Sequence, residues 1–244
     1  MASGLEDDRT ADGQSSRALH GLAGGRSVDS REPYPHPLLD SPAELASHQG
    51  WTEGVYRDLL AFRSGEMTRA DLDAKYLHRK AILVLDLTGF TISCIELGAA
   101  QSFLRILDAQ SVCIPVLRQH NAWLIRAFAD DLVALFDDAG SALDAAFEIH
   151  RRTRLFSERG LASERSAECC IGLGFGDVYA IGPNLAMGDE MNRASRLGED
   201  VAQANETLVT KNVYETLRHR PDVVFEPLSD DDMLFPCFRA TSAR

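Results

Sequence analysis

Residues 81–91, AILVLDLTGFT, place an aspartate, Asp86, at the end of a run of five apolar residues. An apolar run of this length is typical of a buried strand. A carboxylate at the end of such a strand loses part of its hydration, so it needs a charged partner nearby. The stretch therefore predicts a strand that carries a functional acid to the edge of a sheet.

Bulk composition describes an acidic chain with enough apolar residues for a substantial core. The chain has 244 residues, 45% of them hydrophobic, which predicts one main domain. Its net charge of -12, from 25 basic and 37 acidic residues, argues against nucleic acid or an anionic membrane as a partner. Neither a secretory leader nor a transmembrane run of about 18 apolar residues is found. Five cysteines, an odd number without CxxC spacing, suit a reducing compartment, so a cytoplasmic protein is predicted.

Three segments follow one another along the chain. Residues 1–40 are rich in Gly, Ser, Asp and Arg and poor in large apolar side chains, which predicts a disordered tail. Residues 41–78 show helical periodicity, and Thr68 with Asp71 forms a capping-box pattern, so a helical N-terminal extension is predicted. The extension could serve regulation or dimerisation, or it could simply pack on the core. Residues 79–244 are expected to form the main domain.

The main domain alternates strands and helices. Segment 171–182, IGLGFGDVYAIG, has glycines at alternate positions, which predicts a strand that another backbone approaches closely. The order β-α-β-β-α-β, with later additions, predicts a ferredoxin-like α+β fold whose helices pack on a mainly antiparallel sheet. The expected elements are a strand at 81–87, a helix at 96–119, a turn at 120–121, a hairpin of 122–128 and 132–136, a helix near 139–160, a strand at 169–181, a helix near 189–203, a strand at 206–210, a helix at 211–219 and two C-terminal strands.

Two acids are expected to meet at one end of this sheet. Asp86 ends the first strand, and Asp130 lies in the turn that joins the next two strands. A ferredoxin-like sheet places its first strand beside its third, so the two carboxylates can approach closely. They would repel each other unless a cation lay between them, and Mg²⁺ suits such oxygen ligands. Asp131 is a rival for Asp130, and either could instead be a plain turn residue.

Four motifs, in order along the chain, carry a family resemblance. DLTGFT at 86–91 resembles the metal motif D-[IL]-x-G-F-T, and ADDLVALF at 129–136 resembles G-D-x-x-x-A-x-F, with alanine replacing the usual glycine and Asp130 at the metal position. Segment 171–182 is similar to a strand of the type V-G-I-x-x-G, and GDEMNRASRL at 188–197 matches G-D-x-V-N-x-x-x-R-L. Together these segments resemble the class III adenylate and guanylate cyclases, which implies that 79–244 is a nucleotidyl cyclase catalytic domain.

The resemblance implies a head-to-tail homodimer with each active site at the interface. Asp86 and Asp130 would come from one chain, and Asn192 and Arg196 from the other. Two Mg²⁺ or Mn²⁺ ions would be held by both aspartates with help from the Leu87 carbonyl. One ion would lower the pKa of the ribose 3′-hydroxyl, and the other would bind the triphosphate.

The implied reaction converts a nucleoside triphosphate into a 3′,5′-cyclic nucleotide and pyrophosphate for intracellular signalling. Asn192 would orient the ribose, and Arg196 would stabilise charge that develops on the α-phosphate. These two residues are four apart, so they share a face of the predicted helix. Phe90 and Thr91 are expected to contact the substrate as part of the first motif.

The positions that select the base in this family depart from its pattern. Adenylate cyclases usually carry Lys with Asp or Thr there, and guanylate cyclases usually carry Glu with Cys, whereas this chain has Arg126 and Leu185. Arginine cannot accept a hydrogen bond from the exocyclic amine of adenine, and leucine offers none. The base therefore stays open: an oxygen-rich base such as guanine or uracil suits Arg126, and a pyrimidine cyclase like those of bacterial phage defence is one option. Alternatively, Arg126 simply pairs with a nearby acid.

A second departure concerns the triphosphate. The family often has a lysine-containing turn near the C-terminus, but Ser229–Met233 of this chain contains three acids. Arg193 or a tail residue could supply the missing cation. The alternative is a weak or inactive cyclase-homology domain that binds nucleotide or a partner without turnover.

Overall fold

The structure, a computed structural model, divides the chain into two units. One unit comprises residues 1–38 and the other residues 39–244, and each is considered by itself. The predicted disordered tail, 1–40, lies almost entirely outside the described residues. The described residues are 36–48, 50–162, 167–181, 185–228 and 234–243.

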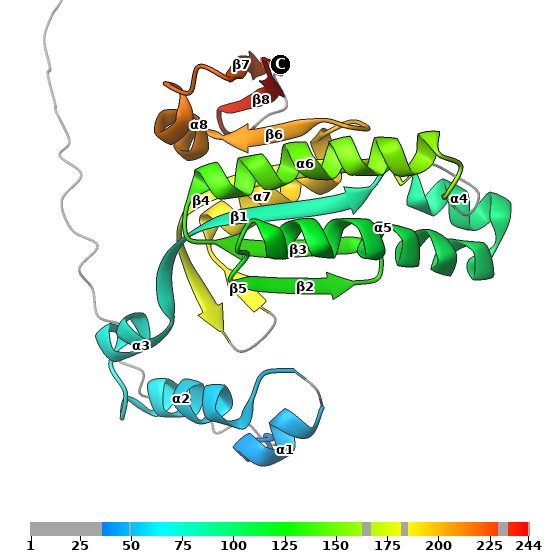
Figure 1. Cartoon of the computed structure of the whole chain (residues 1–244). Helices are drawn as coiled ribbons and strands as arrows, with labels where there is room; N and C mark the ends of the chain where they lie inside the picture. Colours follow the sequence, from blue (N-terminus) through cyan, green and yellow to red (C-terminus); the bar gives the residue numbers. More distant parts are fainter. Residues whose placement is uncertain (1–35, 49, 163–166, 182–184, 229–233, 244) are drawn as a thin grey trace, which may run out of the picture. The chain divides into compact units, whose positions relative to one another are not determined.

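Helices and strands alternate along the second unit (Figure 1). None of the helices within the described ranges has the length and apolarity needed to cross a bilayer. The helices are α1 Pro42–Ser47, α2 Glu53–Ser64, α3 Arg69–Tyr76, α4 Phe90–Leu97, α5 Ala99–Gln119, α6 Ala139–Glu158, α7 Asp189–Ser195, the π-helix η1 Arg196–Val201 and α8 Lys211–Leu217. The strands are β1 Leu77–Leu87, β2 Leu124–Phe128, β3 Asp131–Phe136, β4 Cys169–Ile181, β5 Leu185–Met187, β6 Thr207–Thr210, β7 Val223–Leu228 and β8 Cys237–Ser242.

A single sheet has the strand order β2-β3-β1-β4-β6-β8-β7, and β5 pairs with β4. The first four strands of this order are those of the βαββαβ unit, with β1 between β3 and β4 and antiparallel to both. The pairing of β4 with β6 is parallel. The predicted ferredoxin-like α+β fold is therefore confirmed, and β5 to β8 are additions to it.

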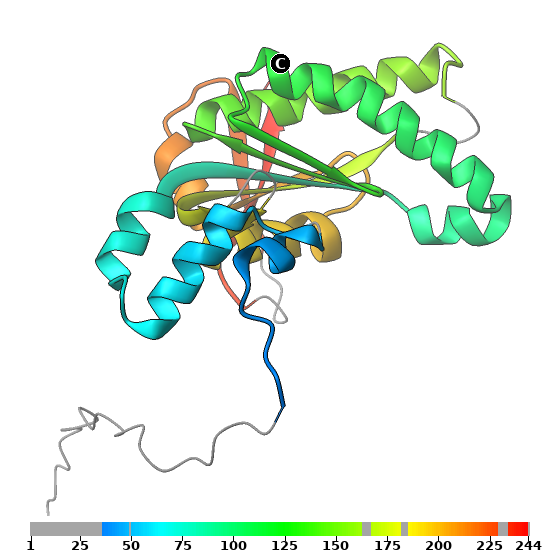
Figure 2. The same ribbon diagram turned by 90° about the horizontal axis from the view of Figure 1, so that it is seen from below.

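The two faces of the sheet are covered by different helices. Leu83 and Leu85 of β1 join the larger core beneath α5 and α6, whereas Ile82 and Val84 join a second core with Ala194 of α7 (Figures 1 and 2). Side chains alternate between faces along a strand. Asp86 therefore lies on the face that carries α7 and η1.

Glycines of β4 let α7 and η1 lie directly on the strand. A Cβ at Gly172 would come 2.1 Å from the carbonyl oxygen of Ala194, and one at Gly174 would come 2.7 Å from that of Glu190. A Cβ at Gly176 would likewise meet the Glu190 side chain at 2.7 Å. The close backbone approach predicted from the alternating glycines is confirmed, and it fixes the helix that carries Asn192 and Arg196.

The N-terminal extension packs against the far end of β4. Val55 of α2 and Leu72 of α3 are buried with Ile181 in a small core. The Tyr179 hydroxyl donates a hydrogen bond to Asp73 of α3. The predicted capping box at Thr68 is present, and the extension is helical up to the start of β1.

Several details of the chain differ from the predicted elements. The strand expected at 81–87 begins earlier, at Leu77, inside the segment predicted as the N-terminal extension. The helix expected at 96–119 is instead two helices, because Gly98 adopts a φ of 83° and ends α4. The helix expected near 189–203 changes at Arg196 from an α-helix into the π-helix η1. Strand β5 was not expected, since its three residues are too few to show an alternating pattern.

Candidate active site

The β2–β3 hairpin presents Asp130 at its turn. Phe128 pairs with Asp131, so Ala129 and Asp130 form a two-residue connection. Ala129 has a φ of 50°, a left-handed conformation that glycine adopts more readily than alanine. This is the position where the cyclase motif usually has glycine, so the turn has the backbone of that motif without its usual residue.

Replacing Ala129 by glycine is expected to raise the free energy of unfolding by about 1 kcal/mol, because glycine removes the left-handed penalty. Urea denaturation followed by circular dichroism measures the change. Ala127→Gly, in the regular part of β2, is the matched control and should lower the free energy by about 0.5–1 kcal/mol. Destabilisation by Ala129→Gly would contradict the assigned turn.

Asp86 faces both acids of the hairpin. The β1–β3 ladder ends with Leu85 opposite Leu132, so the next residues along the strands are Asp86 and Asp131. The pKa of Asp86 is raised to about 7. Burial is the largest cause, followed by the charge of Asp130 and then by that of Asp131. The strand register places Asp131 opposite Asp86, and the charges of both hairpin acids act on Asp86. That Asp86 and Asp130 are the metal-binding pair stays a prediction.

A divalent cation fits the chemistry of this cluster. The carboxylates repel one another, and the Leu87 backbone hydrogen bond lowers the pKa of Asp86 by less than burial and these charges raise it. Within the described ranges, no three His, Cys, Asp or Glu side chains are arranged to hold a metal together. The protein's contribution would thus be two carboxylates, and Mg²⁺ commonly binds through one or two carboxylates plus substrate phosphates. The role of the Leu87 carbonyl stays a prediction.

Asp86→Asn is expected to raise the free energy of unfolding of the metal-free protein by about 2 kcal/mol at pH 8 and by little at pH 4. The shift of about three pKa units corresponds to about 4 kcal/mol, which is halved here because Asp86 is partly exposed to solvent. Since the folded pKa is raised, the wild type loses stability as the pH rises from about 4 through 7. Urea denaturation in EDTA across this range checks the slope; an equal slope in the variant would contradict it.

The loop after Asp86 is held by a buried arginine. Arg105 of α5 is 5% exposed and donates from Nη2 to the Thr88 carbonyl oxygen at 2.6 Å. Gly89 has a φ of 65° and precedes Phe90, the first residue of α4. No side chain among the described residues caps this helix start, and the exposed Thr91 lies in its first turn. The loop therefore presents uncapped helix amides beside the carboxylates.

Asn192 and Arg196 lie on the helix that crosses the carboxylate face. Asn192 of α7 is exposed, and Arg196 begins η1. The Nε of Arg196 is buried and has no hydrogen-bond partner among the described residues. A Cβ at Gly198 would come 2.8 Å from the Val84 carbonyl oxygen, so η1 lies directly on β1. The guanidinium therefore has hydrogen-bonding capacity left for a ligand.

Arg126 and Leu185 occupy different strands of the sheet. Arg126 of β2 pairs with Val133, and its buried Nε has no partner in the described part of the chain. Its charge lowers the pKa values of Asp131 and Glu199, although burial raises both overall. Leu185 begins β5 and pairs with Ile181. Arg126 thus lies beside acids of the carboxylate cluster without being tied into an ion pair with a described residue.

Solved structures resemble this fold over about two thirds of the chain. The adenylyl cyclase CyaB from P. aeruginosa matches with a TM-score of 0.55 and 18% identity over 69% of this chain and 97% of its own. The nucleotidyl cyclase fold is therefore shown. An adenylate/guanylate cyclase/hydrolase from Silicibacter pomeroyi matches with a TM-score of 0.55 and 24% identity over 67% of this chain and 95% of its own.

A third structure with the cyclase fold contains a nucleotide. It is the guanylate cyclase domain of RhGC from Catenaria anguillulae in complex with GTP, with a TM-score of 0.55 and 15% identity over 68% of this chain and 97% of its own. No protein family profile and no curated protein matches the sequence. The common feature is therefore the cyclase fold, which the ordered motifs had predicted.

Arg193, a candidate to replace the usual triphosphate-binding lysine, already has partners within the chain. Arg193 forms an ion pair with the buried Glu190 at 2.7 Å and lies over the ring of Phe235. Glu190 accepts further hydrogen bonds from the Phe175 amide and the Thr210 hydroxyl. Arg193 is thus engaged in holding α7 within the cyclase fold, and the acidic segment 229–233 lies outside the described residues.

Three residues of the site were missed or undervalued by sequence reasoning. Glu199 contributes to the raised pKa of Asp86, and Asp131 lies at the next ladder position on the same face. Arg105 holds the loop after the metal motif. Arg105 had a detectable signal, since it stands between the apolar residues Leu104 and Ile106 of α5, but its partner could not be read from the sequence, and the position of Glu199 depends on the π-helix.

Proposed function

We propose that the chain is a nucleotidyl cyclase that converts a nucleoside triphosphate into a 3′,5′-cyclic nucleotide and pyrophosphate. The observation that carries the proposal is the cluster of Asp86 with the hairpin acids, in which burial first, and then the charges of Asp130 and Asp131, raises the pKa of Asp86 to about 7. Asn192 and Arg196 follow on the helix that covers the same face. The cyclase fold and the order of the four motifs support this assignment.

Asp86 and Asp130 would hold two Mg²⁺ or Mn²⁺ ions, with the Leu87 carbonyl as a further ligand. The mutual repulsion of the carboxylates is the feature that favours cations here. When bound, the ions would supply Lewis-acid activation of the ribose 3′-hydroxyl and would neutralise charge on the triphosphate. This places the acidic cluster at the reacting end of the substrate.

Residues of a second chain would complete the site. The substrate's 3′-oxygen would form a bond to the α-phosphorus as the bond to pyrophosphate breaks, and the proton of the 3′-hydroxyl would pass to solvent water. Asn192 would orient the ribose, and Arg196 would donate to the α-phosphate oxygens as charge develops. The unpartnered Nε of Arg196 supports this role, because a buried donor without a partner is costly unless a ligand satisfies it.

The start of α4 would bind the triphosphate. Free N–H groups in the first turn of a helix favour anions, and no described side chain occupies those of α4. Phe90 and Thr91 contribute the first of these amides, and the exposed Thr91 hydroxyl can add a further hydrogen bond. This site would compensate in part for the missing C-terminal lysine.

Arg126 would contact the base in this scheme. Its guanidinium lacks an ion pair with any described residue, so it remains available to donate to a carbonyl oxygen or ring nitrogen. Leu185 would add only apolar contact. Guanine or uracil therefore suits the site better than adenine, whose exocyclic amine needs an acceptor.

Exposed apolar side chains near the hairpin favour the second chain. Gln110 of α5 donates to the Ala129 carbonyl at 3.4 Å, which places α5 against the turn that carries Asp130. Large exposed apolar areas usually mark interaction surfaces, and a second copy seated here would lie next to the carboxylates. Large exposed apolar side chains lie on α4, α5 and β2, namely Ile92, Ile95, Phe103, Leu104, Leu107 and Phe128.

Product analysis with all four nucleoside triphosphates tests the proposed function. Purified full-length chain in Mn²⁺ is expected to release pyrophosphate and one 3′,5′-cyclic nucleotide, identified by mass spectrometry, with GTP or UTP as the preferred substrate. Asp130→Ala should abolish the product without unfolding the chain. Thermal stabilisation by a nucleotide without product would contradict the proposal and would instead support a nucleotide-binding module without turnover.

A further inference from the structure

A cavity lies between α6 and the strands β6 and β8. Its volume is about 680 Å³, within the size range of small-molecule sites. Phe147 and His150 of α6 line one side, and Thr207 and Thr241 line the other. Since α6 packs on the opposite face of the sheet from α7, this cavity is separate from the carboxylate site.

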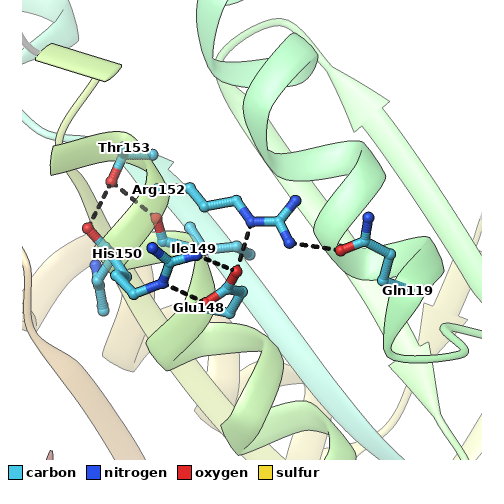
Figure 3. Close-up of polar contacts among 7 residues, drawn as sticks. Gln119, Glu148, Ile149, His150, Arg152 and Thr153 are labelled. Atoms are coloured by element: carbon cyan, nitrogen blue, oxygen red, sulfur yellow. Dashed lines mark hydrogen bonds and ion pairs between the residues drawn. The ribbon is translucent and has the colours of Figure 1, made fainter. Parts of the chain in front are cut away.

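The acid at the middle of the cavity is already neutralised. Glu148 accepts two hydrogen bonds of 2.7 Å from Arg151 and one of 2.6 Å from Arg152 (Figure 3). Arg152 in turn donates to Gln119 of α5 at 2.6 Å, so its position is fixed. These contacts hold the pKa of Glu148 down at about 2.

At one end of the cavity, two acids share a single arginine. Arg220 forms ion pairs with Asp144 at 2.8 Å and Asp222 at 2.6 Å. At the other end, Arg154 is exposed, lines the cavity and forms no ion pair with a described residue. Around the cavity, four guanidinium groups therefore face three carboxylates, which leaves an excess of one positive charge in a chain whose net charge is -12; the groups are Arg151, Arg152, Arg154 and Arg220 against Asp144, Glu148 and Asp222.

The floor of the cavity contains an acceptor without a donor. The Oδ1 of Asn205 is buried and has no hydrogen-bond partner among the described residues, whereas its Nδ2 donates to Glu168 at 2.9 Å. Beside it, His150 is 7% exposed and contacts the Thr207 hydroxyl at 3.0 Å. A buried acceptor of this kind favours a ligand that brings a hydroxyl or amine donor.

We propose that this cavity is an effector site for a small hydroxylated anion, either a hydroxycarboxylate or a sugar phosphate. The anionic group binds Arg154, and a hydroxyl of the ligand donates to Asn205 Oδ1. The surplus carboxylate at Arg220 is offset by the surplus guanidinium at Glu148, so the charge of Arg154 remains as the excess. A ligand that fits both groups carries an anionic group for Arg154 and a hydroxyl that can donate to Asn205 Oδ1.

The floor of the cavity is connected to the loop that follows Asp86. Glu168, whose side chain accepts from Asn205, also accepts the Thr88 amide through its carbonyl oxygen at 3.2 Å. The Asn205 amide donates to the Cys169 carbonyl at 2.9 Å, and Cys169 pairs with Leu87. A ligand on Asn205 therefore acts on the backbone of the loop that follows Asp86. An effect of the ligand on turnover rests on the proposed function, whereas binding of the ligand does not.

Calorimetry on the full chain in EDTA, without nucleotide, tests the site. Citrate and ribose 5-phosphate are the two probes, and binding of either supports the site and identifies its class. Tricarballylate, which is citrate without the hydroxyl, should bind at least about tenfold more weakly than citrate if citrate is the ligand class. Arg154→Gln should weaken the bound probe about tenfold or more, while Arg159→Gln, at the end of the same helix, should leave binding unchanged.

Hydrogen exchange provides a second readout. The bound probe should slow exchange of the peptide that contains Thr88, in the wild type and not in Arg154→Gln. Failure of both probes to bind the wild type, or equal binding to Arg154→Gln and the wild type, would overturn the site. Because neither measurement needs a metal or a triphosphate, an inactive cyclase would leave the result interpretable.

Discussion

Asp86→Asn and Asp130→Asn are each expected to lower cyclic nucleotide formation by at least about 10³-fold, since either change would remove one of the two proposed metal ligands. The two acids lie close enough for Asp130 to raise the pKa of Asp86. Each substitution also removes like-charge repulsion, so neither should unfold the chain. Product formation at saturating Mn²⁺, with circular dichroism of each variant, measures both effects.

Asp131→Asn is the matched control for this pair. Asp131 differs from Asp130 by one position and contributes to the same electrostatic cluster. If Asp131 contributes only its charge and does not coordinate a metal ion, its substitution should change turnover by less than about tenfold. Loss of turnover in Asp131→Asn with activity retained in Asp130→Asn would show that Asp131 is the second ligand.

Much of the sheet could be predicted from the sequence, because its signals are local. The strand at 169–181 has the predicted bounds, since apolar residues and glycines alternate over 171–176 and apolar residues continue to Ile181. The order of elements then predicted the ferredoxin-like topology, which places β1 beside β3. That placement alone brings Asp86 to Asp130, so the carboxylate pair follows from topology.

Other features depend on contacts that the sequence does not display. The π-helix η1 follows α7 without any helix-breaking residue at Arg196, and it brings Glu199 to the carboxylates. The interruption at Gly98 could have been anticipated from the glycine, but the apolar periodicity continues across it. Arg105 donates to the Thr88 carbonyl over a long sequence separation, which periodicity cannot reveal.

Neither the sequence nor the structure identifies the base that the proposed site would select. Arg126 lies beside Asp131 and Glu199, whose pKa values it lowers, yet it pairs with no described residue. Arg126 therefore offsets part of the charge of the acidic cluster, and its Nε has no hydrogen-bond acceptor among the described residues. Product identity with four triphosphates decides between these uses of the guanidinium.

Mixing two inactive variants is expected to restore activity if the site is shared between chains. In a heterodimer of Asp86→Asn and Arg196→Ala chains, one site contains both substitutions and the other contains none. Random pairing makes about half of the dimers mixed, and each mixed dimer has one intact site of two. About one quarter of all sites is therefore intact. Co-expression with two affinity tags isolates the mixed dimer, in which half of the sites are intact.

The matched control mixes Asp86→Asn with Asp130→Asn. Both substitutions affect the carboxylate half of the site, so each site of this heterodimer carries one of them and none is intact. Turnover of the two tandem-purified heterodimers is the most direct test of a metal-binding pair that faces Asn192 and Arg196 of a second chain. The account predicts about half of the wild-type rate for the Asp86→Asn/Arg196→Ala dimer and almost none for the control. No recovery in either dimer, or equal recovery in both, would contradict it.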